Sequence, residues 1–169
     1  DVEARAAVKA AYEYVGPVYM RFGRLAVPVI NDETTYKFEI GKGVELRPGK
    51  DITIIATGLP VSESLEAAKL LAEDGIDAQV INIHTIKPLD EELVVKAAQA
   101  TGRVFTVEEH SIIGGLGSAV MECLAEKNPV KVTRIGVRDT FGESGPAKDL
   151  LHKYELDAEG IYKQIKAAL

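Results

Sequence analysis

The chain has 169 residues, 46% hydrophobic and 27% charged, with a formal net charge of −6. This composition is typical of one globular domain, or of one domain with part of another. Mild acidity and scattered basic residues argue against nucleic-acid binding, and no apolar run reaches the roughly 20 residues of a membrane helix. Cys123 is the only cysteine, so no internal disulfide can form, and we expect a buried thiol in a cytoplasmic protein.

The first 24 residues are expected to form one helix and one short strand. Apolar residues recur at helical spacing through residues 1–14, and a Gly-Pro pair then ends the helix before a strand at residues 18–20. One helix and one strand cannot enclose a core, so we expect this segment to belong to another domain. The chain opens on Asp1 without a methionine, which suggests the interior of a longer protein or a processed start.

The rest of the chain is expected to be a linker at residues 25–37 and an α/β domain at residues 38–169. A first strand is expected near residues 38–45, and from residue 51 strands and helices alternate. Further strands are expected at residues 52–56, 78–82, 104–107 and 130–137, and helices at residues 62–73, 91–101, 117–127, 146–153 and 158–168, with Ser62 and Asp90 as caps. This alternation predicts a three-layer fold, in which a mostly parallel five-stranded sheet has helices on both faces.

A binding or catalytic site is expected at the carboxyl ends of the strands, where ligands bind in open parallel sheets. Three loops should meet there, at residues 57–62, 84–90 and 108–117. Their residues should form either a site or an interface. His84 and His110 could approach each other at this edge, but no third metal ligand is evident, so we expect no metal site.

The triplet Glu108-Glu109-His110 is the most polar feature of these loops. A carboxylate beside a histidine can serve general acid–base chemistry. Neighbouring residues of a strand point to opposite faces, however, so the two glutamates are not expected to act as a pair. The favoured interpretation is structural: one glutamate binds loop backbone, while His110 supports an interface.

Gly114, Gly115 and Gly117 precede a predicted helix, whose free N–H groups could hold an anion. The run does not match the dinucleotide-binding pattern, because Val120 stands where a third glycine or alanine belongs. Close packing of the backbone, including packing against another subunit, is the favoured interpretation.

Two further features indicate contacts with other molecules. Phe141 lies in a polar loop that contains several glycines. Its ring could anchor a neighbouring molecule, or it could pack under its own loop as a hydrophobic staple. The sequence does not distinguish these two roles. Arg21 and Arg24 follow the first predicted strand, and paired arginines suit phosphate.

Six motifs, in order along nearly the whole chain, resemble transketolase, especially the split type whose C-terminal half is a separate chain. They are residues 16–24, 40–43, 51–58, 85–90, 108–118 and 142–145. Deoxyxylulose-phosphate synthase and the β subunits of 2-oxo acid dehydrogenases share some of these features. Two motifs favour transketolase: Thr-Ile-Lys-Pro-Leu-Asp at residues 85–90 and Gly-Glu-Ser-Gly at residues 142–145.

This resemblance implies an assignment for each segment. Residues 1–24 would be the last helix and strand of a pyrimidine-binding domain, and residues 38–169 the transketolase C-terminal domain, a dimer-building unit. The intact enzyme would use thiamine diphosphate with Mg²⁺ or Ca²⁺ to move two-carbon ketol units between sugar phosphates. It would be a homodimer, with a separate N-terminal subunit in the split type.

The family residues that activate the cofactor and bind the metal lie upstream of this sequence. We therefore expect no catalytic, cofactor-binding or metal-binding residue here, and an isolated chain without activity. Arg24, four residues before Pro28, matches the family arginine that contacts substrate phosphate, with Arg21 as the alternative register. The expected interface cluster comprises Glu108, Glu109, His110, Gly114, Gly115, Gly117 and Phe141. The competing interpretation is a free-standing α/β binding domain, in which residues 1–24 would pack on the rest.

Overall fold

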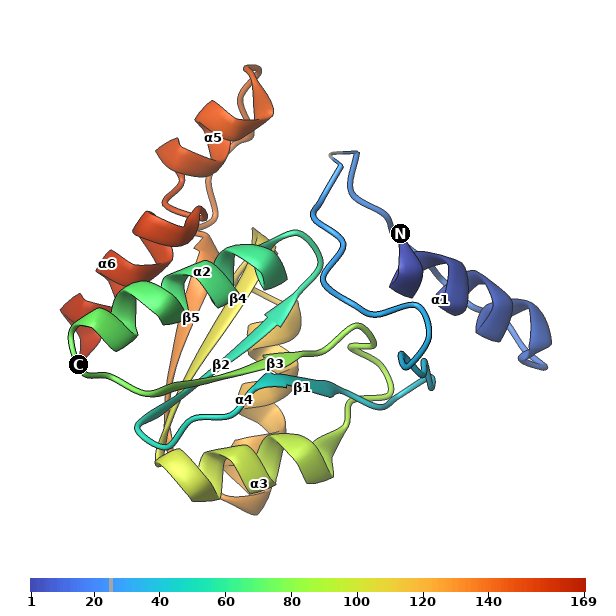
Figure 1. Ribbon diagram of the computed structural model, residues 1–169, viewed down its shortest axis with the longest axis horizontal. Helices are drawn as coiled ribbons and strands as arrows, with labels where there is room; N and C mark the ends of the chain where they lie inside the picture. Colours follow the sequence, from blue (N-terminus) through green and yellow to red (C-terminus); the bar gives the residue numbers. More distant parts are fainter. Residues whose placement is uncertain (25) are drawn as a thin grey trace.

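The computed structural model describes residues 1–24 and 26–169, so Leu25, the first residue of the expected linker, lies outside the described residues (Figure 1). The described chain forms one five-stranded sheet with the order β1-β3-β2-β4-β5. The strands are β1 (Val44–Arg47), β2 (Ile52–Thr57), β3 (Ala78–Asn82), β4 (Arg103–Ser111) and β5 (Lys131–Val137). Only the pairing of β1 with β3 is antiparallel, which confirms the predicted mostly parallel sheet.

Helices cover both faces of the sheet, as predicted (Figure 1). α2 (Pro60–Glu73) and α6 (Ala158–Ala168) pack on one face, and α3 (Glu91–Thr101) and α4 (Leu116–Lys127) on the other. Successive residues of β2 serve the two cores: Ile54 packs with α2 and α6, and Ile55 with α3 and α4. A strand buried on both sides needs apolar residues at nearly every position, and this is why β2 was recognisable as an apolar run.

Of three predicted element starts, those of β1 and α2 differ from the structure and that of α3 agrees with it. β1 begins at Val44 and not near residue 38, because the chain first turns at Gly41, whose φ is +83°. α2 begins at Pro60, a residue suited to a first helical position, so the prediction of Ser62 as its cap was wrong. Asp90 caps α3 as predicted, since its carboxylate accepts a 3.2 Å hydrogen bond from the amide of Leu93.

α1 (Val2–Glu13) contains no buried residue and is held to the domain through polar contacts. The carboxylate of Glu3 accepts hydrogen bonds from the Tyr36 hydroxyl at 2.7 Å and from the side-chain amide nitrogen Nδ2 of Asn82 at 2.6 Å. Residues 18–20 form no strand, so that prediction was wrong. A strand needs a neighbouring strand for its backbone hydrogen bonds, and none of the five described strands pairs with this segment.

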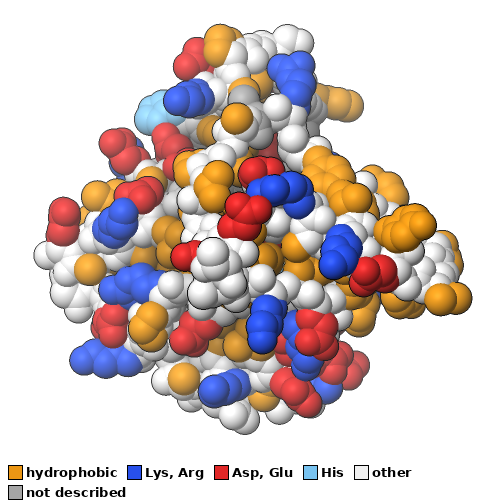
Figure 2. Space-filling model, turned by 45° about the vertical axis from the view of Figure 1, so that its right-hand side comes forward, with side chains coloured by type: hydrophobic (Ala, Val, Ile, Leu, Met, Phe, Trp, Pro, Cys, Tyr) orange, Lys and Arg blue, Asp and Glu red, His pale blue; other side chains and the backbone are white. Residues whose placement is uncertain are grey.

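Large hydrophobic side chains are concentrated on the surface near the N-terminus. Among the described residues, ten of the fourteen exposed large hydrophobic side chains fall between residues 8 and 30. We call this set the N-terminal apolar surface; its members are Val8, Tyr12, Tyr14, Val15, Val18, Tyr19, Phe22, Val27, Val29 and Ile30. Figure 2 shows hydrophobic side chains gathered on the right-hand side of the molecule, where α1 comes forward. Surfaces of this kind commonly mark contacts with other protein.

α5 (Ala147–Lys153) also lacks buried residues, and Lys153 ties it to Glu143 through an ion pair of 2.5 Å. In the part of the chain that the structure describes, no helix has the length and apolar character needed to cross a membrane.

Candidate functional site at the carboxyl end of the sheet

The Glu108-Glu109-His110 triplet lies within β4 and not in a loop as predicted. β4 continues to Ser111 because β5 runs alongside it and Ser111 pairs with Val137, after an irregularity in register beyond Val107. The predicted loop at residues 108–117 is therefore reduced to residues 112–115 before α4 begins.

Glu108 is completely buried, and its carboxylate accepts hydrogen bonds of 2.8 Å from the amides of Leu116 and Gly117. These amides belong to the first turn of α4, where N–H groups have no partner within the helix and the helix dipole favours negative charge. The N-cap residue of α4 is Gly115, which has no side chain to cap it. The interpretation that one glutamate binds loop backbone is therefore confirmed, and the chain's own carboxylate occupies the place that an anion would take.

The glycines of this loop allow the close approach of β4 and α4. A Cβ atom on Gly115 would lie 1.9 Å from Oε2 of Glu108, and one on Gly117 would lie 2.7 Å from Cγ of Arg134. Gly114 has a φ of +77°, a conformation that side chains disfavour. The predicted close packing of the backbone is thus present within the chain, while packing against another subunit stays a prediction.

His110 lies at the half-buried end of β4, near the segment that follows α1. Burial lowers the pKa of His110; the positive charge of Arg21 lowers it further, and the charges of Glu108 and Glu109 oppose these effects. Arg21 therefore lies close enough to β4 for its charge to act on this imidazole. Arg24 is exposed and forms no ion pair within residues 1–24 and 26–169.

Phe141 is 98% exposed, so the interpretation of its ring as a staple beneath its own loop was wrong. The loop follows the end of β5, where the chain leaves the sheet and offers the ring no apolar surface. The role of Phe141 as an anchor for a neighbour stays a prediction.

His84 stacks on Phe38 with the ring centroids 4.2 Å apart, and its Nδ1 lies 2.8 Å from the Thr85 hydroxyl. Burial lowers the pKa of His84, against the opposing charge of Glu3. No group of three or more His, Cys, Asp or Glu side chains suited to a metal ion occurs among the described residues.

One polar cluster was missed by sequence reasoning. Glu3, Tyr36 and Asn82 meet at the end of β3, and burial followed by the nearby carboxylate of Glu3 raises the pKa of Tyr36. Asn82 is 1% exposed, and a polar residue that ends an apolar strand could have indicated such a site. Glu3 carried no comparable signal, because it lies in a helix rich in charged residues.

Comparison with known proteins gives the family. The family described as "Transketolase, C-terminal domain" matches residues 41–161. The chain belongs to this family. The matched residues contain all five strands, Glu108 and the glycine loop.

Relatives of the chain are transketolase-like proteins of greater length. A 6-deoxy-6-sulfo-D-fructose transketolase subunit from Clostridium sp. is 48% identical over 96% of this chain and 50% of its own length. A 1-deoxy-D-xylulose-5-phosphate synthase from Geobacter sulfurreducens is 42% identical over 99% of this chain and 27% of its own. The solved structure titled "Split gene transketolase, inactive beta4 tetramer" is 48% identical, with a TM-score of 0.94 over 99% of this chain and 55% of that one. The chain therefore spans about half the length of the transketolase subunit and about a quarter of the length of the synthase.

Proposed function

We propose that the chain is the C-terminal section of a thiamine-diphosphate-dependent transketolase of the split type. The observation that carries this proposal is the 48% identity with a transketolase subunit over 96% of the chain, which is more of the chain than the C-terminal domain match at residues 41–161. The whole protein, with a separate N-terminal subunit, would transfer two-carbon ketol units between sugar phosphates. Alone, the chain is expected to be inactive.

The described residues do not fit thiamine diphosphate or its Mg²⁺ or Ca²⁺ ion. The amides of α4, which are the anion-binding groups of the glycine loop, already bind Glu108. No suitable cluster of metal ligands occurs in the described part of the chain. We therefore derive no chemical step through these groups and place their binding in the rest of the assembly.

The domain division is part of this proposal: residues 1–24 as the end of a pyrimidine-binding domain, residues 25–37 as a linker and residues 38–169 as the C-terminal domain. The N-terminal apolar surface supports it, because an element that normally packs inside another domain would expose its apolar side chains here. The absence of any buried residue in α1 supports it as well.

Arg24 is proposed to bind the phosphate of the sugar substrate. Its guanidinium is exposed and unpaired within the described residues, and it could form two parallel hydrogen bonds to a phosphate. Arg21 is the alternative, and its position near His110 places it at the carboxyl end of the sheet.

A homodimer is proposed to form through the cluster at the carboxyl end of the sheet. Glu109, His110, Gly114 and Phe141 are at least partly accessible and could contact a partner directly. Glu108 and Gly117 are buried, so their contribution would be to hold the loop in shape.

The proposal is tested by assaying the complete protein together with its separate N-terminal subunit. A ketose phosphate donor, an aldose phosphate acceptor, thiamine diphosphate and Mg²⁺ should yield ketol transfer. Arg24→Ala should raise the KM for the phosphorylated acceptor by about tenfold or more and leave an unphosphorylated acceptor unaffected. Arg21→Ala is the matched comparison, and a larger effect there would move the phosphate site to Arg21.

Deoxyxylulose-phosphate synthase is the second candidate, favoured by the 42% identity over nearly the whole chain. Formation of deoxyxylulose phosphate in place of ketol transfer would establish this candidate and overturn the transketolase assignment.

A further inference from the structure

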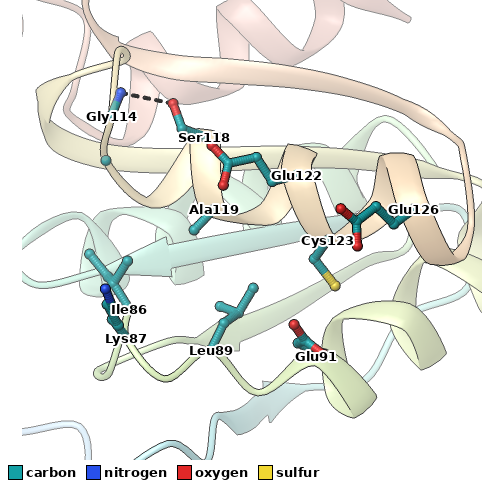
Figure 3. A pocket seen from close by; sticks show the side chains of 11 residues that line it. Ile86, Lys87, Leu89, Glu91, Gly114, Ser118, Ala119, Glu122, Cys123 and Glu126 are labelled. Carbon is teal, nitrogen blue, oxygen red and sulfur yellow. Dashed lines mark hydrogen bonds between the residues drawn. The ribbon is translucent and has the colours of Figure 1, made fainter.

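A groove of about 470 Å³ lies between α4 and the segment that leads into α3. Figure 3 shows Ile86 and Leu89 rising from this segment, with Ala119 and Cys123 projecting from α4 on the other side. These four side chains give the groove an apolar floor. The groove lies on the α3–α4 face of the sheet and is separate from the N-terminal apolar surface.

The mouth of the groove is acidic. Glu122 and Glu126 follow each other along α4, about 6 Å apart along the helix axis by the rise per residue, and both line the groove (Figure 3). Both are exposed, and neither forms an ion pair with another described residue. Glu91 faces them from the start of α3, where its carboxylate is paired with Lys127 of α4, so Glu122 and Glu126 carry the unpaired negative charge of the groove. Lys87 is the one basic residue of the described lining.

Cys123 lies at the floor of the groove. Burial raises the pKa of its thiol; the charge of Glu91 adds to this effect and the charge of Lys127 opposes it. A negative potential over an apolar floor attracts a cation that has an apolar stem, as lysine and arginine do.

We infer that this groove docks a polypeptide segment of a partner protein that carries two lysines or arginines one helical turn apart beside apolar side chains. The spacing of Glu122 and Glu126 matches two cations at positions i and i+4 of a helix, and a helix laid in a groove is a recurring mode of recognition. The stretch of α4 from Ser118 to Glu126 is about 12 Å long, room for roughly two turns of a bound helix. Charge complementarity would set the orientation and the rate of binding.

This inference is independent of the proposed function. The test uses a fluorescent 14-residue helical peptide with leucines and two lysines at i and i+4 on one face, and a control peptide with glutamates in place of the lysines. The Glu122→Gln/Glu126→Gln protein should bind the lysine peptide about tenfold more weakly than the unaltered protein. Glu73→Gln/Glu159→Gln, on α2 and α6, is the matched control because it changes the net charge equally on the opposite face. Circular dichroism checks that each variant is folded.

Cys123 reports where the peptide binds. It is the only cysteine and lines the groove, so the lysine peptide should slow its alkylation several-fold while the glutamate peptide should not. Equal weakening in both double variants, or unprotected Cys123, would overturn the inference. So would competition by spermidine at the peptide's own concentration, which would identify a free polyamine site. Self-association that disappears in Glu122→Gln/Glu126→Gln would identify a second copy of the chain as the occupant and overturn it too.

Discussion

Gly115 and Glu108 fit together so closely that a Cβ atom on the glycine would lie 1.9 Å from the carboxylate oxygen Oε2. The missing side chain at the start of α4 leaves the space in which the carboxylate from β4 reaches the helix amides. A carboxylate beside a histidine suggests acid–base chemistry, but here the carboxylate joins a strand to a helix.

Glu108→Gln should lower the free energy of unfolding by about 2–3 kcal/mol. Glutamine presents an N–H₂ group to one of the two amides that now bind carboxylate oxygens, and it removes the charge that complements the helix dipole. Urea denaturation measures the change. Glu109→Gln, at the half-buried neighbouring position, should cost less than about 0.5 kcal/mol. Equal losses in the two variants would contradict the capping role of Glu108.

Gly115→Ala should destabilise the protein by about 2 kcal/mol or more, because its methyl group must displace the buried carboxylate. Thermal unfolding followed by circular dichroism measures the effect. Gly142→Ala is the control, since a Cβ atom there would have nothing within 4 Å. A Gly115→Ala protein as stable as this control would show that the carboxylate moves aside easily.

Asp90→Ala should cost about 2 kcal/mol, because the carboxylate accepts from the amides of both Leu93 and Gly43. The loss should appear in hydrogen exchange as faster opening of the first turn of α3. Asp1→Ala removes an N-cap residue whose side chain makes no capping hydrogen bond, so it should change stability little. If α3 exchanges at an unchanged rate, Asp90 does not hold its start.

Acidification from pH 8 to pH 5 should reduce the free energy of unfolding. Burial lowers the pKa of His84 and of His110 in the folded protein, so the unfolded chain binds protons more readily. Their contribution is present above the unfolded pKa of about 6.5 and is lost as the pH falls below it towards the folded values. Denaturant unfolding across this range should show a flatter profile for His84→Gln/His110→Gln. A profile as steep as that of the unaltered protein would assign the pH dependence to other groups.

The alternation of strands and helices could be predicted because it rests on local apolar patterns. β2 is a mostly apolar run that only Thr53 interrupts, and Asp90 stands directly before an amphipathic helix, so the type of each element can be predicted from its own residues. The prediction of a strand at residues 18–20 was wrong because a local pattern does not show whether a partner strand is present. The pattern suits a strand, but a strand forms only beside another strand.

The candidate site was predicted less completely. The sequence indicated that Glu108 or Glu109 could bind loop backbone, but it did not show which glutamate turns inward, because that depends on where α4 packs. The interpretation of Phe141 as a residue that packs under its own loop was wrong, because the residue is 98% exposed in the loop after β5.

By itself, the sequence determined the order and type of the main elements, the cap of α3 and the family to which the motifs belong. These depend on side chains only a few residues apart and on backbone preferences that act locally. Only the tertiary structure decided the strand order, the burial of Glu108 and the groove between α4 and the segment that leads into α3. It also brought Glu3 to Tyr36 and Asn82, which are 33 and 79 residues away along the chain. Such contacts are set by which surfaces exclude water together once the whole sheet is covered, and no local pattern encodes that choice.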